Sequence, residues 1–207
     1  MSNRSMQVLG IVGGIASGKS LAAGIFEELG AVVLSGDHFA HQVLREADIL
    51  SAIRDRWGDA IFDDAGEVDR PRVAAIVFGE TAEAPKELKF LEHLTHPRIA
   101  QRLREELSRL RAEAVKIVVL DAALLLKTDW HQICEKILFL ETPLPQRQKY
   151  AALRGWDAEQ LARREACQLP LESKREKADF VVSNTEDLAH LREKIRSVWD
   201  SLNDSKM

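Results

Sequence analysis

Gly13-Gly14-Ile15-Ala16-Ser17-Gly18-Lys19-Ser20 follows directly on the apolar run Val8-Leu9-Gly10-Ile11-Val12. The eight residues fit G-x-x-x-x-G-K-[ST], the pattern of a phosphate-binding loop that stands between a strand and a helix. The apolar run before them predicts a buried strand, and apolar residues at helical spacing over 21–29 predict the helix. The stretch therefore predicts a site for a nucleoside triphosphate.

The residue types of this loop suit a phosphate chemically. Glycines let backbone amides point inward around a phosphate, and the first turn of the following helix adds unpaired N–H groups and the positive end of its dipole. Lys19 can reach the terminal phosphates, and the Ser20 hydroxyl can bind Mg²⁺. The alternative is an ordinary strand–turn–helix whose glycines serve only the turn. A dinucleotide-binding loop is not predicted, because no G-x-G-x-x-G is present.

Composition narrows the class of protein. The 207 residues are enough for one domain with a substantial core. The formal net charge of −4 argues against a general nucleic-acid or membrane-surface binder, and no stretch approaches the length of a transmembrane helix. The two cysteines lack zinc-like spacing and fit a reduced thiol pair. We expect a cytoplasmic protein that is a monomer or a weak homo-oligomer, without nucleic-acid or membrane partners.

The apolar runs predict the fold class. Gly30 ends the first helix, and residues 31–34 form a second apolar run, so a strand, a helix and a strand follow one another. Such a βαβ unit predicts a parallel sheet. Further runs over 116–121, 136–140 and 179–182 predict three more strands. The predicted fold is α/β, a three-layer α/β/α arrangement around a five-stranded parallel sheet.

Two acids follow predicted strands. Asp37 comes shortly after the second strand, and Asp121 ends the third. Ligands of open parallel sheets bind at the carboxyl ends of the strands. Asp37 could orient or deprotonate an attacking hydroxyl or hold Mg²⁺ through water, or it could cap the helix that begins near His38. Asp121 is a candidate magnesium ligand.

Several helices are predicted between the second and third strands. Helical periodicity covers 38–57, begins again after Asp69-Arg70-Pro71 and extends over 86–114, where His96-Pro97 predicts a bend or a restart. A single crossover connection between two parallel strands needs fewer helices than the two or three predicted here. Residues 59–114 are therefore predicted to form an inserted, substrate-holding subdomain, with structural padding as the alternative.

Residues 144–178 form a basic helical segment between the fourth and fifth strands. A helix over 146–155 is followed by one that Asp157 caps and by a short turn that Pro170 opens. Arginines on a mobile element neutralise the charge that develops during phosphoryl transfer, so we expect a lid. The alternative is a solvated charged face, because acids interleave with the basic residues at Glu159, Glu165, Glu172 and Glu176.

The order of these motifs resembles the dephospho-coenzyme A kinase family over nearly the whole chain. The family's phosphate loop, T-G-G-I-G-S-G-K-S, is matched by residues 12–20. Its D-A-D motif corresponds to Ser35-Gly36-Asp37, its D-R pair to Asp69-Arg70 and its H-P pair to His96-Pro97.

The motifs of the C-terminal half follow the same family. Arg147 and Arg154 fall on its lid arginines, and Gln168 falls on its A-Q motif. Ala178-Asp179 and Asn184 match its A-D-x-V-x-x-N ending. The ordered set is specific, whereas the phosphate loop alone is common to many kinases.

The sequence departs from the family pattern in three places. Ser35 replaces the first aspartate of D-A-D, and Ala123 and Lys127 replace the proline and the glutamate of a P-L-L-F-E segment. Ala16 replaces a loop glycine, which is a mild change if its φ is negative.

The resemblance implies a phosphate-loop fold of the nucleoside monophosphate kinase type. It also implies an ATP-dependent phosphotransferase that moves the γ-phosphoryl group of ATP to the ribose 3′-hydroxyl of dephospho-coenzyme A, the last step of coenzyme A biosynthesis. ATP and Mg²⁺ are the implied cofactors, and dephospho-coenzyme A is the implied small-molecule substrate. Two alternatives are a kinase of the nucleoside monophosphate type acting on another acceptor, and a catalytically weak nucleotide-binding module.

Residues and resemblance together assign the following roles. The expected catalytic residues are Asp37, Lys19, Arg147 and Arg154. The expected nucleotide-binding residues are Gly13, Gly14, Ile15, Ala16, Ser17, Gly18, Lys19, Ser20, Leu21 and Asn184. The expected acceptor-binding residues are Asp37, Asp69, Arg70, His96 and Gln168. The expected magnesium ligands are Ser20 and Asp121.

Overall fold

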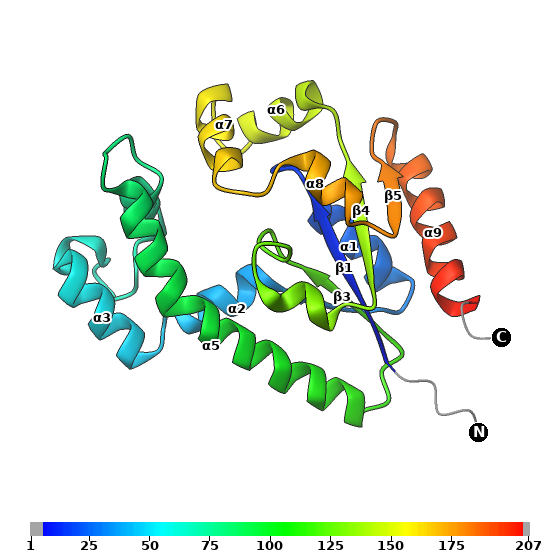
Figure 1. Ribbon diagram of the computed structural model, residues 1–207, viewed down its shortest axis with the longest axis horizontal. Helices are drawn as coiled ribbons and strands as arrows, with labels where there is room; N and C mark the ends of the chain where they lie inside the picture. Colours follow the sequence, from blue (N-terminus) through cyan, green and yellow to red (C-terminus); the bar gives the residue numbers. More distant parts are fainter. Residues whose placement is uncertain (1–5, 205–207) are drawn as a thin grey trace. The chain divides into compact units, whose positions relative to one another are not determined.

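The computed structural model describes residues 6–204. Its five strands are all parallel and lie in the order β2-β3-β1-β4-β5, with β1 in the middle (Figure 1). The strands are β1 Gln7–Gly13, β2 Val32–Ser35, β3 Ile117–Asp121, β4 Lys136–Glu141 and β5 Phe180–Ser183. The predicted α/β fold with a five-stranded parallel sheet is confirmed.

Each strand is followed along the chain by one or more helical segments, which is usual for parallel strands. The helical segments are α1 Lys19–Glu28, α2 Gly36–Val43, α3 Ala47–Trp57, η1 Asp59–Ile61, α4 Arg70–Val77, α5 Ala84–Ala112, η2 Asp129–Ile133, α6 Leu144–Ala152, α7 Ala158–Ala166, α8 Leu171–Glu176 and α9 Leu188–Asp204. Within residues 6–204, no helix combines the length and the apolar character needed to cross a membrane.

The sheet, α1 and α9 share one hydrophobic core. Phe26 of α1 and Ile195 of α9 are fully buried and belong to the same cluster as Ile11, Val119 and Leu138 of the three central strands. These strands are buried on both faces, which is why their sequences are continuous apolar runs. Burial of each large side chain contributes about 1.5–3 kcal/mol. The core therefore fixes β1 as the base of the phosphate loop.

The strand register brings the ends of β1, β2 and β3 to one edge. Ile11 pairs with Asp121 on one side of β1, and Gly13 pairs with Leu140 on the other. Ser35 at the end of β2 pairs with the same Asp121. The phosphate loop therefore begins at the edge where an open parallel sheet binds its ligands.

The chain divides into two compact units. One contains the sheet, α1 and α6–α9, and covers residues 6–36 and 108–204. The other covers residues 37–107 and is helical apart from an isolated antiparallel bridge between Phe62 and Val68.

Within the helical unit, the predicted single helix over 38–57 is wrong. The chain leaves the helix after Val43 and starts α3 at Ala47, with Glu46 extended at φ −72° and ψ 136° in the N-cap position. The Glu46 carboxylate accepts a 2.8 Å hydrogen bond from Arg102 Nε of α5. This long-range ion pair stabilises a break that the local periodicity does not reveal.

The predicted restart at His96-Pro97 is wrong, because α5 runs unbroken through Pro97 for 29 residues. The alternative, a bend at this position, stays a prediction. A proline inside a helix removes one amide donor and costs about 3 kcal/mol. Ile99, Leu103 and Leu107 of the following turns are almost fully buried. Their burial offsets the lost hydrogen bond, and this tertiary contribution is not visible in the local sequence around Pro97.

The residue Ala114, just after the C-terminus of α5, has a strained backbone conformation. Ala114 has φ +58°, and its amide donates to Arg111 O while the Val115 amide donates to Leu110 O, the two bonds of a Schellman ending. Glycine is favoured at this position, because a residue with a β-carbon is strained in the left-handed conformation by about 1 kcal/mol. We expect Ala114→Gly to raise the melting temperature by about 2–4 °C in calorimetry.

The control is Ala112→Gly, at the last helical residue of α5. It is expected to lower the melting temperature, since glycine is a weak helix former. Equal shifts for the two variants would contradict the assignment of strain to Ala114.

Candidate active site

The phosphate loop is a tight turn between β1 and α1. Gly18 has φ +92° at the N-cap of α1, a conformation that glycine adopts without strain. Ala16 has φ +57°, so the expectation of a mild change at this position, which required a negative φ, is not met. An alanine in this region is strained by about 1 kcal/mol. Its methyl group packs with Ala151 and Leu161 of α6 and α7.

Two glycines of the loop permit close contacts. A β-carbon on Gly13 would lie 2.8 Å from Leu140 O, and one on Gly14 would lie 2.8 Å from Arg147 Cδ. Both distances are too short for real β-carbons. Gly13 needs to be glycine because the backbone of β4 approaches it, and Gly14 leaves room for the Arg147 side chain of α6.

Lys19 and Ser20 make polar contacts at the start of α1. Lys19 Nζ donates to Gly14 O at 2.9 Å, and Ser20 Oγ donates to Asp121 Oδ2 at 2.8 Å. The structure therefore brings the two predicted magnesium ligands together. A hydroxyl and a carboxylate oxygen are the ligand types that Mg²⁺ prefers.

Arg147 lies against the loop. Its side chain is 5% exposed, and its Nε donates to Thr142 O at 3.0 Å. Its guanidinium also forms an ion pair with Glu165 of α7, and Glu165 Oε1 accepts a 3.3 Å hydrogen bond from the Ile15 amide. The Glu165 carboxylate thus accepts a hydrogen bond from one loop amide and pairs with one predicted lid arginine, so this part of the loop contacts a negative charge.

Arg154 lies elsewhere in the same segment. It is exposed, and its guanidinium carbon lies 5.8 Å from the centre of the Trp156 ring. Trp156 packs on the small cluster that also contains Ile15. The structure therefore brings one of the two predicted lid arginines to the loop and leaves the other on the surface.

Two buried side chains hold the loop from the adjacent strand ends. Thr142 Oγ1 and Asn184 Nδ2 both donate to Ser17 O, at 2.8 and 2.9 Å. Asn184 is 5% exposed and close to Gly18. Asn184, predicted as a nucleotide ligand, therefore supports the loop backbone. Leu21, also predicted there, is about half exposed in the first turn of α1.

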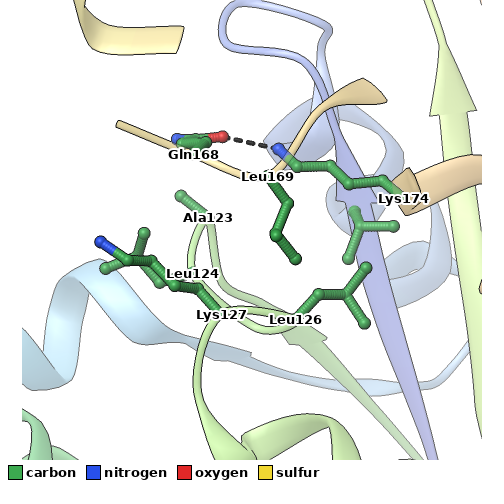
Figure 2. A pocket seen from close by; sticks show the side chains of 8 residues that line it. Ala123, Leu124, Leu126, Lys127, Gln168, Leu169 and Lys174 are labelled. Atoms are coloured by element: carbon green, nitrogen blue, oxygen red, sulfur yellow. Dashed lines mark hydrogen bonds between the residues drawn. The ribbon is translucent and has the colours of Figure 1, made fainter. Parts of the chain in front are cut away.

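Gln168 and Lys174 border a small pocket beside the loop (Figure 2). Lys174 Nζ donates to Gln168 Oε1 at 2.6 Å and to Gly13 O at 3.0 Å. Burial, followed by the positive charge of Lys19, lowers the pKa of Lys174 to about 8. The sequence placed Lys174 on a basic lid but gave no signal that it is buried.

The remaining predicted residues belong to the helical unit. Asp37 is exposed in the first turn of α2, and His96 is half-buried within α5. Asp69 caps α4 by accepting from the Arg72 amide at 3.1 Å, and Arg70 is the exposed first residue of that helix.

His41, which the sequence analysis did not single out, stands one turn after Asp37 in α2. Its Nε2 is buried without a hydrogen-bond partner among the described residues. Burial and the Arg70 charge lower its pKa, while the Asp37 charge acts in the opposite direction. The spacing of Asp37 and His41 on one helical face is the signal that could have found it.

The sequence is similar to those of known proteins. The family model described as dephospho-CoA kinase matches residues 7–190. The chain belongs to the dephospho-CoA kinase family. A dephospho-CoA kinase of Rhodopirellula baltica is 31% identical over 98% of this chain and 94% of its own.

Solved structures agree with the family assignment. A dephospho-CoA kinase structure from Campylobacter jejuni has a TM-score of 0.71 at 25% identity, covering 97% of this chain and 98% of that one. A shikimate kinase structure from Acinetobacter baumannii, at 12% identity and a TM-score of 0.56, covers 99% and 97% and shares the fold alone. The expected phosphate-loop kinase fold is confirmed.

Two departures from the pattern of the dephospho-CoA kinase family lie at one place. Ala123 and Lys127, which replace a proline and a glutamate, both line the pocket that Gln168 and Lys174 border (Figure 2). The reversed charge at Lys127 therefore makes this pocket more basic.

Proposed function

We propose that this chain transfers the γ-phosphoryl group of ATP to the ribose 3′-hydroxyl of dephospho-CoA and so catalyses the last step of coenzyme A biosynthesis. The proposal rests on family membership over residues 7–190, together with one observation at the site. That observation is the phosphate loop with Lys19 and with Ser20 hydrogen-bonded to Asp121.

The loop supplies the nucleotide site. Backbone amides of residues 14–20 bind the β-phosphate. When ATP binds, Lys19 gives up its hydrogen bond to Gly14 O and donates instead to oxygens of the transferred phosphoryl group. Arg147, already against Gly14, spreads the developing charge together with Arg154 once residues 144–178 close as a lid. Such catalysis is mostly positioning and electrostatic stabilisation.

The acceptor side is assigned to the helical unit. Asp37 orients the 3′-hydroxyl and accepts its proton. Asp69, Arg70 and His96, within the 59–114 insertion, bind dephospho-CoA, and Gln168 contributes from the lid. The chain position of Asp37, two residues after β2, supports this role.

Ser20 and Asp121 would hold the magnesium ion. Among the described residues no group of three or more histidine, cysteine or acidic side chains is arranged so that it could hold a metal ion. A site with one hydroxyl and one carboxylate suits Mg²⁺, which usually keeps several waters and is also bound by substrate phosphates. Bound Mg²⁺ would neutralise phosphate charge.

Asp121→Asn tests the magnesium assignment. The amide keeps the shape but lacks the negative charge, so the Mg²⁺ concentration for half-maximal rate should rise at least ~10-fold. A Mg²⁺ titration at fixed ATP measures this. The matched control is Asp129→Asn at the exposed start of η2, which should leave the titration unchanged. Superimposable curves for wild type and Asp121→Asn would remove Asp121 from the metal site.

The function itself is tested by comparing acceptors. ADP release should be fast with dephospho-CoA and at least ~100-fold slower with adenosine, AMP or pantetheine phosphate, because only the correct acceptor is positioned for attack. Preference for AMP would favour a kinase of the nucleoside monophosphate type. Tight ATP binding without turnover of any acceptor would favour a nucleotide-binding module.

The proposal extends to the setting of the protein. We place it in the cytoplasm as a monomer or weak homo-oligomer without a nucleic-acid partner, consistent with its net charge of −4.

A further inference from the structure

Lys174 is an unusual lysine. It belongs to α8, where its neighbours Arg175 and Glu176 are exposed, yet it is itself 3% exposed. A buried ammonium group normally has a carboxylate partner. Its two hydrogen-bond acceptors are neutral instead, Gly13 O at 3.0 Å and Gln168 Oε1 at 2.6 Å.

The bond to Gly13 fixes the direction of a loop amide. A peptide group is planar and trans, so its C=O and N–H point in opposite directions. When Lys174 holds the Gly13 oxygen, the Gly14 N–H of the same peptide must point away from Lys174. One lysine contact on β1 therefore sets the orientation of the first amide of the phosphate loop.

The next peptide of the loop has the same arrangement. Lys19 Nζ holds Gly14 O at 2.9 Å, and the N–H of that peptide, on Ile15, donates to the Glu165 carboxylate at 3.3 Å. In this peptide, Lys19 contacts the carbonyl oxygen on one side, and the Glu165 carboxylate accepts from the N–H on the other.

The charges around Lys174 are mainly positive. Lys19 of α1 and Arg147 of α6 disfavour its charged form, and Glu165 of α7 favours it. Lys127 lines the same pocket from the segment after β3 (Figure 2). Two cations and one acid thus act on Lys174, so a phosphate at the loop would stabilise its charge.

We infer that Lys174 is a positioning residue of the phosphate loop, which orients the Gly13–Gly14 peptide and adds its positive charge to the field that binds nucleotide phosphates. This inference rests on the proposed nucleotide site. It assigns α8 to the phosphate-binding side of the enzyme, whereas the sequence grouped the whole of 144–178 as a lid.

The pH dependence of nucleotide affinity follows from this role. The pKa of Lys174 is lowered to about 8 in the free protein, so its charge is present at pH 7 and lost by pH 9. Bound phosphates favour the protonated form. Affinity for ADP should therefore fall about tenfold between pH 7 and pH 9, and ADP binding at pH 8 should take up protons.

The test measures ADP binding by calorimetry without an acceptor. Lys174→Met should weaken binding at pH 7 at least ~10-fold, on the scale of a lost charged hydrogen bond, and should abolish the fall toward pH 9. The control Lys177→Met, at an exposed lysine just after α8, should match wild type. Gln168→Glu, which places a carboxylate beside Lys174, should move the fall in affinity to higher pH, a change that a purely structural role would not produce.

Wild-type affinity and pH dependence in Lys174→Met would overturn the inference. If that variant does not fold, the wild-type protein still decides, because absence of proton uptake at pH 8 would overturn it as well. Failure of the wild-type protein to bind ADP would instead refute the proposed nucleotide site. ADP binding without dephospho-CoA turnover would refute only the proposed acceptor.

Discussion

Asp37→Ala is expected to lower kcat at least ~100-fold while the affinity for ADP stays at the wild-type level. A positioned general base contributes about 10²–10⁴ to a rate, and the substitution removes the only carboxylate assigned to the acceptor hydroxyl. Asp37 is exposed in the first turn of α2, so its removal leaves the buried core intact.

Steady-state kinetics with saturating ATP and dephospho-CoA measure this effect. Calorimetry with ADP checks that nucleotide binding is kept. Asp55→Ala, at another exposed acid of the helical unit, is the matched control and should turn over normally. Near-normal kcat in Asp37→Ala would exclude Asp37 as the base and favour a role limited to the helix N-terminus.

Lys19→Ala is expected to reduce kcat/KM for ATP by at least ~1,000-fold. In phosphoryl transfer the loop lysine contacts the phosphates in both the ground state and the transition state, so its loss affects KM and kcat together. In the present structure its amine is 2.9 Å from Gly14 O, within reach of the loop interior.

The effect is read from initial rates over a wide range of ATP concentrations. Lys149→Ala, an exposed lysine of α6, provides a variant with the same change of net charge and should behave as wild type. Unchanged kinetics for Lys19→Ala would remove the basis for a phosphate loop at residues 13–20.

Local patterns predicted the scaffold well. The loop, the five strands and the capped helix after Asp157 depend on neighbours in sequence, and Asp157 indeed forms a capping box with Gln160. Ser20 and Asp121, predicted from separate motifs, share a hydrogen bond because parallel strands end at one edge.

Long-range contacts explain what could not be predicted. Lys174 lies in a stretch of alternating charges typical of an exposed helix, and its acceptor Gly13 is 161 positions away in the sequence. The break before α3 depends on Arg102, and the continuity of α5 through Pro97 depends on burial of its later turns. The positive φ of Ala16 likewise follows from the loop geometry, since alanine itself does not favour it.

The order of the strands in the sheet determines which of them should open first when the protein partially unfolds. β1 has neighbours on both sides, whereas β2 and β5 are four-residue strands at the two edges. Edge strands open at lower free energy than a central strand, so their amides should exchange with deuterium first. Opening at β2 would therefore disturb the segment that leads to Asp37, and opening at β5 would release the Asn184 contact that holds Ser17. Under mild denaturation, the enzyme should lose activity while β1, β3 and β4 still protect their amides from exchange.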